Sequence, residues 1–148
     1  MRILLDTNVL IDMYARRQPF EKDAARLVVM SVLGDAELWA TSNSFTDVFF
    51  VLRKTFNSRE VQDMIERSLE WINVCSVNSD DIKRALSCRW SDFEDCIVDV
   101  CADKIKADYV LTRDCSGFAS SKEAVLDPKG FFAMLERDRG LTYGTVDW

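Results

Sequence analysis

The chain has 148 residues, of which 48% are hydrophobic and 11% aromatic, a size and composition that allow one well-packed core. It contains no apolar stretch of the roughly 18 residues that cross a bilayer, and the apolar run at its N-terminus is too short for a secretory signal. We therefore expect a single cytoplasmic domain over residues 1–148, with no membrane partner.

The residue types that the chain lacks limit the catalytic and metal-binding chemistry open to it. The chain has no histidine, which excludes Ser-His and Cys-His nucleophile pairs and histidine zinc sites. Its five cysteines are an odd number without Cys-x-x-Cys spacing, so they predict neither a disulfide framework nor a thiolate zinc site. The net charge of -6 gives no general attraction for nucleic acid. Catalysis therefore has to come from carboxylates, hydroxyls, lysine or a metal ion.

The first part of the chain alternates a short apolar run with helical spacing. Residues 2–5 predict a buried strand, and Asp6 with the polar residues after it supplies turn and cap chemistry for a first helix. Pro19 suits the first turn of a second helix, whose apolar stripe includes Val32 and which ends at Gly34.

The same alternation continues to the end of the chain. Strands are predicted at residues 37–41, 71–77, 108–112 and 124–126, and further helices begin near residues 42–45, 58, 80, 92 and 128. Ser91 or Asp92 caps the sixth helix, whose inner face holds Phe93, Ile97, Val100 and Cys101. Alternating strands and helices predict a three-layer α/β/α domain with a central parallel sheet of four to five strands.

Four acidic residues fall where a parallel sheet brings its ends together. Asp6 ends the first strand and Asp114 follows the fourth, while Asp47 and Asp95 lie in the first turns of helices. The carboxyl ends of parallel strands and the N-termini of the following helices share one edge, where ligands bind in such folds. Asp6 and Asp114 also suit a helix cap or a turn, whereas Asp47 stands among apolar neighbours and needs a partner or a cation.

The sixth helix carries further acids on one face. Asp92, Asp95 and Asp99 follow the helical period opposite the apolar stripe. This face is either simply solvated or part of a site. Asp92 is the expected cap, so Asp95 is the first choice for a functional acid. Asp99, one turn further on, is an alternate or fourth ligand.

Four segments, taken in order, resemble the PIN domain, a nuclease family that includes the toxins of many bacterial toxin-antitoxin pairs. They are Ile3 to Leu10, Ser44 to Phe50, Asp92 to Cys96, and Val110 to Asp114 with Gly117-Phe118. The resemblance spans nearly the whole chain and places the four family acids at Asp6, Asp47, Asp95 and Asp114. Asn8 and Thr112 resemble polar positions that line the family's site. Many members carry Glu at the second acid, so the shorter Asp47 departs from the pattern.

The resemblance implies an endoribonuclease that cleaves single-stranded RNA with water, using Mg²⁺ or Mn²⁺ held by the acids. Four crowded carboxylates repel one another unless hard cations neutralise them, and both ions prefer oxygen ligands. Asp6 and Asp95 are expected to be direct ligands, Asp114 a direct or water-mediated ligand, and Asp47 a ligand or a residue that positions the attacking water. A toxin-like member would bind an antitoxin protein and form a homodimer.

Contacts to RNA have to come from cations near this edge of the sheet. Arg113 is the best candidate for a phosphate contact, because it adjoins Asp114. The other cations near these motifs are expected to be mostly solvated charges, and they are Arg16, Arg17, Lys22, Arg26, Arg53 and Lys54.

Two other functions fit parts of the sequence. The first is a catalytically inactive PIN-like module that binds RNA or protein, which the complete set of acids disfavours. The second is a haloacid-dehalogenase-type phosphatase, which also has an Asp closing its first strand. That chemistry needs a second Asp two residues later, where this chain has Asn8.

Overall fold

A computed structural model describes residues 1–146, and residues 147–148 of the predicted domain lie outside the described part. Its centre is a five-stranded sheet in the order β3-β2-β1-β4-β5, in which every neighbouring pair is parallel. The strands are β1 (Arg2–Leu5), β2 (Glu37–Thr41), β3 (Ile72–Cys75), β4 (Tyr109–Leu111) and β5 (Val125–Leu126). The predicted parallel sheet is confirmed, with all five strands.

Seven α-helices and one short 3₁₀ helix, η1, connect and follow these strands in the described part of the chain. They are α1 (Thr7–Tyr14), α2 (Glu21–Val32), α3 (Ser42–Leu52), α4 (Ser58–Ser68), α5 (Ser79–Cys88), α6 (Phe93–Ile105), η1 (Cys115–Phe118) and α7 (Pro128–Arg139). Local sequence explains several starts. Asn57 forms a capping box with Glu60 at α4, and Pro128 stands in the first turn of α7, as predicted.

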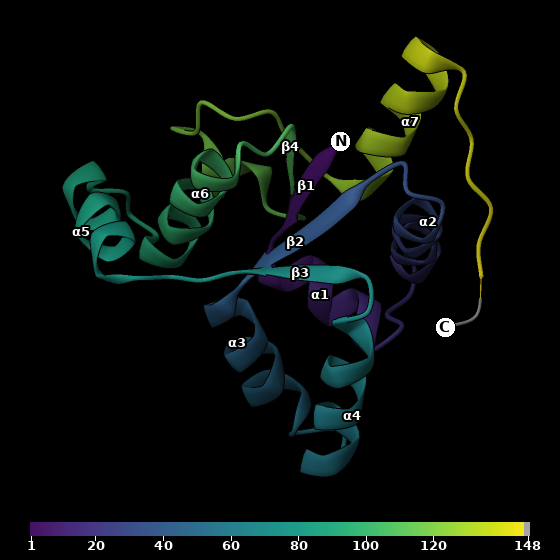
Figure 1. Ribbon diagram of the computed structural model, residues 1–148, viewed down its shortest axis with the longest axis horizontal. Helices are drawn as coiled ribbons and strands as arrows, with labels where there is room; N and C mark the ends of the chain where they lie inside the picture. The colour runs from purple at the N-terminus through teal and green to yellow at the C-terminus, as the bar shows by residue number, and fades with distance from the viewer. Residues whose placement is uncertain (147–148) are drawn as a thin grey trace.

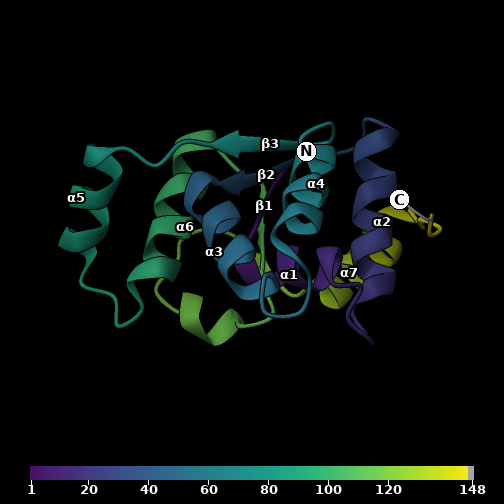
Figure 2. The same cartoon turned by 90° about the horizontal axis from the view of Figure 1, so that it is seen from below.

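The helices cover both faces of the sheet, so the molecule has three layers (Figures 1 and 2). Side chains alternate along β1. Ile3 and Leu5 join the apolar core that contains residues of α1, α2, α3, α4 and α7, whereas Leu4 joins the core that contains residues of α5 and α6. All three side chains are fully buried. The continuous apolar run at residues 2–5 therefore reflects a strand that is covered on both faces.

The central strand β1 is the point where the chain switches sides of the sheet. From β1 the chain moves outward through β2 to β3, and then returns by α5 and α6 to β4 on the opposite side of β1. Such a switch leaves a crevice outside the carboxyl ends of the two strands concerned. Here those ends are Leu5 of β1 and Leu111 of β4, which are paired in register.

Three details of the helices differ from the prediction. Pro19 precedes α2 instead of starting its first turn, because Phe20 is the N-cap and Glu21 the first helical residue. Val32 ends α2 and is 73% exposed, because it lies on the opposite side of the last turn from Met30, which is fully buried in the core. Phe93 is 44% exposed, because it opens α6 and a side chain there leans past the N-terminal end of the helix.

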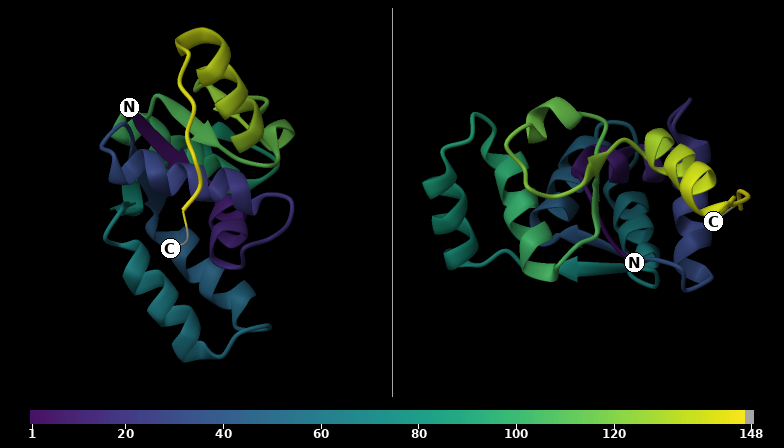
Figure 3. Two further views of the ribbon diagram at one scale, coloured as in Figure 1. Left: turned by 90° about the vertical axis from the view of Figure 1, so that its right-hand side faces the viewer. Right: turned by 90° about the horizontal axis from the view of Figure 1, so that it is seen from above.

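The segment after α7 runs back across α2 (Figure 3). The Tyr143 carbonyl accepts the Nε–H of Arg26 at 3.1 Å, and the Tyr143 hydroxyl donates to the Asp35 carboxylate at 3.0 Å. Tyr143 is therefore tied to α2 through Arg26 and to the turn after α2 through Asp35. Among residues 1–146, every helix is too short or too polar to span a bilayer.

Candidate active site

Asp6 follows the carboxyl end of β1 and is almost fully buried, with 4% of its surface exposed. Its Oδ1 accepts the backbone N–H of Thr7 at 2.6 Å and so caps α1. Its Oδ2 accepts hydrogen bonds from the Thr112 hydroxyl at 2.7 Å and from the Asn8 amide at 2.5 Å. Asp6 therefore caps α1, as its sequence context also allowed. Two further hydrogen-bond donors hold its carboxylate at the crevice between β1 and β4.

Asn8 and Thr112 join the first helix to the loop after β4. The Asn8 amide donates to the Thr112 hydroxyl oxygen at 3.0 Å, and the Asn8 carbonyl oxygen accepts the N–H of Arg113 at 3.0 Å. The Thr112 oxygen also accepts the N–H of Asp114 at 3.0 Å. Because Thr112 is fully buried, this network holds the backbone of Asp114 beside Asp6 without the help of solvent.

Asp95 lies in the first turn of α6, close to the same carboxylates. Burial raises its pKa to about 7, and the charges of Asp92, Asp6, Asp114 and Glu94 act in the same direction. Burial also raises the pKa of Asp6, helped by Asp92 and Asp114 and opposed by its hydrogen bonds. The structure therefore brings Asp6, Asp95 and Asp114 together. We call them, with Asp92 and Glu94, the acidic cluster.

Asp114 caps η1, so it has the turn role that its sequence context also allowed. It accepts hydrogen bonds from the Ser116 hydroxyl and from the N–H of Gly117, and these bonds lower its pKa. Gly117 lies directly against Asp95: a Cβ at this position would clash with the Asp95 carboxylate. Only glycine therefore lets η1 approach Asp95 this closely.

Glu94 belongs to the cluster, although the sequence analysis did not select it. Its Oε1 accepts the hydroxyl of Thr7 at 3.1 Å, and that hydroxyl lies 3.0 Å from Ser44 Oγ at the start of α3. Burial raises the pKa of Glu94, with the charges of Asp47, Asp6 and Asp92 adding to the shift. Asp47, half-buried on α3, lines a small cavity of about 100 Å³ together with Glu94. Asp47 thus joins the cluster through Glu94.

The remaining acids of α6 have distinct positions. Asp92 is the predicted N-cap, and its carboxylate accepts the N–H groups of Glu94 at 2.9 Å and Asp95 at 3.1 Å. Asp99, one turn further along, accepts a hydrogen bond from Ser121 in the loop before β5, and its charge raises the pKa of Glu123 in that loop. Asp99 therefore contacts the loop before β5, one helical turn along α6 from Asp95.

Arg113 is held by a buried acid that the sequence analysis did not select. Its Nε lies 2.8 Å from Asp12 Oδ2, and its guanidinium stands over the ring of Phe20 at 4.8 Å from the centroid. Asp12 is only 2% exposed, and burial raises its pKa against the opposing charges of Arg113 and Arg17. Arg113 therefore neutralises a core carboxylate, which the adjacency of Arg113 to Asp114 did not indicate.

The donor set fits a hard divalent cation better than any other cofactor. Within residues 1–146, no three acidic or thiol side chains converge into a ready-made metal cage. Mg²⁺ and Mn²⁺ do not require one, because they keep several waters and take one or two carboxylates directly. Asp6 and Asp95 have raised pKa values, and the metal ligands that the cluster offers are carboxylate oxygens, whose charge a proton or a cation would offset.

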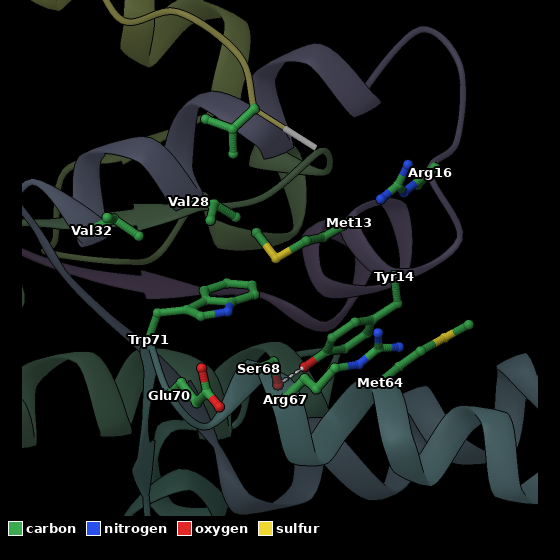
Figure 4. Close-up of a pocket in the computed structure, with 11 residues that line it drawn as sticks. Met13, Tyr14, Arg16, Val28, Val32, Met64, Arg67, Ser68, Glu70 and Trp71 are labelled. Carbon is green, nitrogen blue, oxygen red and sulfur yellow. Dashed lines mark hydrogen bonds between the residues drawn. The ribbon is translucent and has the colours of Figure 1, made fainter. Parts of the chain in front are cut away.

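A larger groove, lined by none of the cluster residues, lies between α1, α2 and α4 (Figure 4). This groove has a volume of about 630 Å³, and Met13, Val28 and Trp71 are among its lining residues. The Tyr14 hydroxyl lies 2.6 Å from the Ser68 hydroxyl inside it. Burial raises the pKa of Tyr14 to about 12, so the groove offers a neutral phenol and apolar surface, and its lining also includes Arg16, Arg67 and Glu70.

Solved structures with the same fold come from several organisms. One is VapBC2 of Rickettsia felis bound to a promoter DNA fragment, with a TM-score of 0.67 and 11% identity, covering 86% of this chain and 98% of that chain. A second is a toxin-antitoxin complex of Klebsiella pneumoniae, with a TM-score of 0.62 and 21% identity over 85% and 97% of the two chains. A third is VapC20 of Mycobacterium tuberculosis, a sarcin-ricin loop cleaving toxin, with a TM-score of 0.62 and 16% identity over 79% and 95%.

At these identities the structures show the fold alone. Among curated proteins, none matches the chain. The family profile described as PIN domain matches residues 2–116, which contain all five acids of the cluster and Asp47. This match covers well over half of the sequence. The chain therefore belongs to the PIN domain family.

Proposed function

We propose that the protein is a metal-dependent endoribonuclease that hydrolyses single-stranded RNA at the acidic cluster. One observation carries the proposal: Asp95, with a pKa raised to about 7, stands beside Asp6, Asp92, Glu94 and Asp114 at the switch point between β1 and β4. Carboxylates packed this closely repel one another and destabilise the folded chain unless they bind a positively charged ligand. PIN family membership supports a nuclease as that function.

Each acid has a role in this proposal. Asp6 and Asp95 hold the cation, with Asp114 as a direct or water-mediated ligand. When bound, Mg²⁺ or Mn²⁺ lowers the pKa of water and stabilises the charge that builds on the phosphate. Asp47 and Glu94, on the α3 side of the cluster, orient the attacking water by hydrogen bonding.

Other residues of the chain hold this arrangement in place. Thr112 and Asn8 fix one oxygen of Asp6, and Asp92 caps the helix that carries Glu94 and Asp95. Without these hydrogen bonds the carboxylates would rotate away from one another, because like charges repel. The polar network therefore supplies the preorganisation that hydrolysis of a phosphodiester needs.

We also propose a cytoplasmic toxin role with an antitoxin protein as partner. Support comes from the similar structures, which include a toxin-antitoxin complex of Klebsiella pneumoniae, VapBC-1 of Haemophilus influenzae and a sarcin-ricin loop cleaving toxin. A homodimer belongs to the same proposal. Co-expression with the product of a neighbouring small reading frame, followed by co-purification, would test the partner.

The nuclease proposal is tested with labelled single-stranded RNA in Mn²⁺, Mg²⁺ or EDTA. The wild type is compared with Asp6→Asn and with the control Asp80→Asn, whose side chain is 87% exposed on α5. We expect cleavage by the wild type and the control in metal, and at least a 100-fold loss in Asp6→Asn, with circular dichroism confirming that all three fold.

Two results would contradict the proposal. Cleavage that survives in EDTA and in Asp6→Asn would not arise from this site. Failure of the folded, metal-loaded wild type to cleave several RNAs would favour the inactive binding module instead.

A further inference from the structure

A second cavity, of about 710 Å³, lies between the N-terminal ends of α2 and α7, helices that contact each other at the edge of the molecule (Figures 1 and 3). We call it the α2/α7 pocket. Its lining includes Phe20, Lys22, Arg26, Arg113, Asp127 and Lys129. Of its ten lining residues four are cations and two are aspartates, Asp23 and Asp127, in a chain whose net charge is -6. The pocket is therefore a local exception to the acidic character of the molecule.

Two of its cations have no partner in the described part of the chain. Lys22 and Lys129 are exposed and make no ion pair or hydrogen bond with their side chains within residues 1–146. By contrast Lys83, Lys104 and Lys106 each pair with an aspartate at 2.7 to 3.5 Å. The two ammonium groups in the pocket are thus available to a ligand that carries negative charge.

The backbone at the start of α2 also favours a negatively charged ligand. Phe20, the N-cap of α2, makes no side-chain capping hydrogen bond, so the first turn of this 12-residue helix keeps N–H groups without side-chain acceptors. The acid of that turn which lines the pocket, Asp23, is neutralised by Arg26 at 3.2 Å. The cationic side chains and the start of α2 therefore attract the same kind of ligand, an anion.

One residue connects the pocket with the acidic cluster. The Arg113 guanidinium lies over the Phe20 ring in the pocket, while its backbone N–H donates to Asn8 and the next residue is Asp114. The pocket therefore adjoins the loop that carries Asp114, and a polyanion lying across the acidic cluster can extend toward it. Because the cluster itself repels phosphates, the attraction that holds such a strand has to come from neighbouring cations.

We propose that the α2/α7 pocket binds a backbone phosphate of single-stranded RNA next to the phosphate that is cleaved. Lys22 and Lys129 contact the phosphate, and the apolar surface of Pro19, Phe20 and Pro128 receives the attached nucleoside. This inference rests on the proposed nuclease function, since it takes the occupant to be the substrate strand.

The test measures RNA binding separately from cleavage. Fluorescence anisotropy follows a labelled oligouridine of about 12 nucleotides, in EDTA, bound to protein that carries Asp6→Asn to prevent cleavage. Into this background we introduce Lys22→Gln with Lys129→Gln, or the control Lys83→Gln with Lys106→Gln, which removes the same charge from α5 and the end of α6.

We expect the pocket variant to raise the Kd about tenfold and the control by no more than about twofold. The slope of log Kd against log salt should fall by about 0.7 for each phosphate contact that is lost. Equal effects of the two double variants would overturn the proposal. So would an oligoglutamate peptide of the same charge that binds as tightly as the RNA and loses affinity in the same variant, because the pocket would then serve an acidic protein segment.

The two proposals fail in different ways. If the wild type does not cleave RNA but the pocket variant still loses RNA affinity, the nuclease proposal is wrong and the pocket remains an RNA site. If the wild type cleaves RNA with metal and the pocket variant binds RNA like the control, the pocket proposal alone is wrong.

Discussion

The carboxyl group of Asp95 is expected to make stability depend on pH when no metal is present. Its folded pKa of about 7 lies above the unfolded value of about 3.9. Between these pH values the folded chain holds more protons than the unfolded chain, so the free energy of unfolding falls as pH rises. In Asp95→Asn this loss disappears, and we expect the variant to be more stable by about 2 kcal/mol at pH 8.

Urea unfolding in EDTA between pH 4 and pH 8 measures this effect. The wild-type curve should fall relative to that of Asp95→Asn across the window. Parallel curves would mean that Asp95 ionises in the folded state as easily as in water.

Glu94 gives a prediction about the site itself. Glu94→Gln keeps an acceptor for the Thr7 hydroxyl but removes the charge beside Asp47. We expect RNA cleavage and Mn²⁺ affinity to fall about tenfold or more, with little change in stability. The matched control is Glu136→Gln on the exposed side of α7. Calorimetric Mn²⁺ titration and cleavage rates measure both effects, and equal behaviour of the two variants would remove Glu94 from the site.

At the scale of elements, the approach of η1 to α6 depends on one glycine. Gly117→Ala places a methyl group against the Asp95 carboxylate, whereas Gly144→Ala meets nothing within 4 Å. We expect the first change to lower cleavage more than tenfold by displacing Asp95, with a stability change of about 1 kcal/mol or less. Gly144→Ala should leave the cleavage rate unchanged. Full activity of Gly117→Ala would show that η1 moves freely over α6.

The ion pair between Asp12 and Arg113 ties α1 to the loop after β4. Arg113→Gln leaves the carboxylate of Asp12 buried without its cation, and we expect this to cost about 2 kcal/mol of unfolding free energy. Adding Asp12→Asn removes the buried charge and should restore most of the loss. Urea unfolding of the two single variants and the double variant measures the coupling, and additive losses would contradict it.

The order and type of the elements could be predicted because hydrophobic periodicity reports which faces are buried. The hydrophobic pattern does not show which apolar residues of a helix the neighbouring elements leave uncovered. For that reason it placed Val32 and Phe93 in the core, although both stand at the ends of their helices and are exposed. The start of α2 was predicted at Pro19 because proline is favoured in the first turn of a helix. In the structure the helix begins two residues later, at Glu21.

The acids at the ends of β1 and β4 could be predicted because a parallel sheet places strand ends and helix starts at one edge. Glu94 and Asp12 could not be predicted in the same way. Their partners, Thr7 for Glu94 and Arg113 for Asp12, are 87 and 101 positions away, and the contacts depend on how α6 and the loop after β4 pack against α1.

At the scale of the whole molecule, metal binding should stabilise the folded chain. Only the folded state gathers the carboxylates, so Mn²⁺ at about 100 times its Kd should raise the unfolding free energy by about 2.7 kcal/mol. Asp6→Asn should lose most of this increase. Thermal unfolding with and without Mn²⁺ measures it, and an equal shift in both proteins would place the ion elsewhere.

The hydrogen bond between Asp6 and Thr112 spans 106 positions, from the start of the chain to its last third. While the protein is being synthesised, Asp6 therefore cannot meet Thr112 or Asp114 until β4 and the loop after it have left the ribosome. A partly made chain holds the acids of α1 and α3 without the completed crevice. For the proposed nuclease, the order of synthesis would delay hydrolysis until most of the domain exists, so that unfinished chains would leave the RNA around them intact.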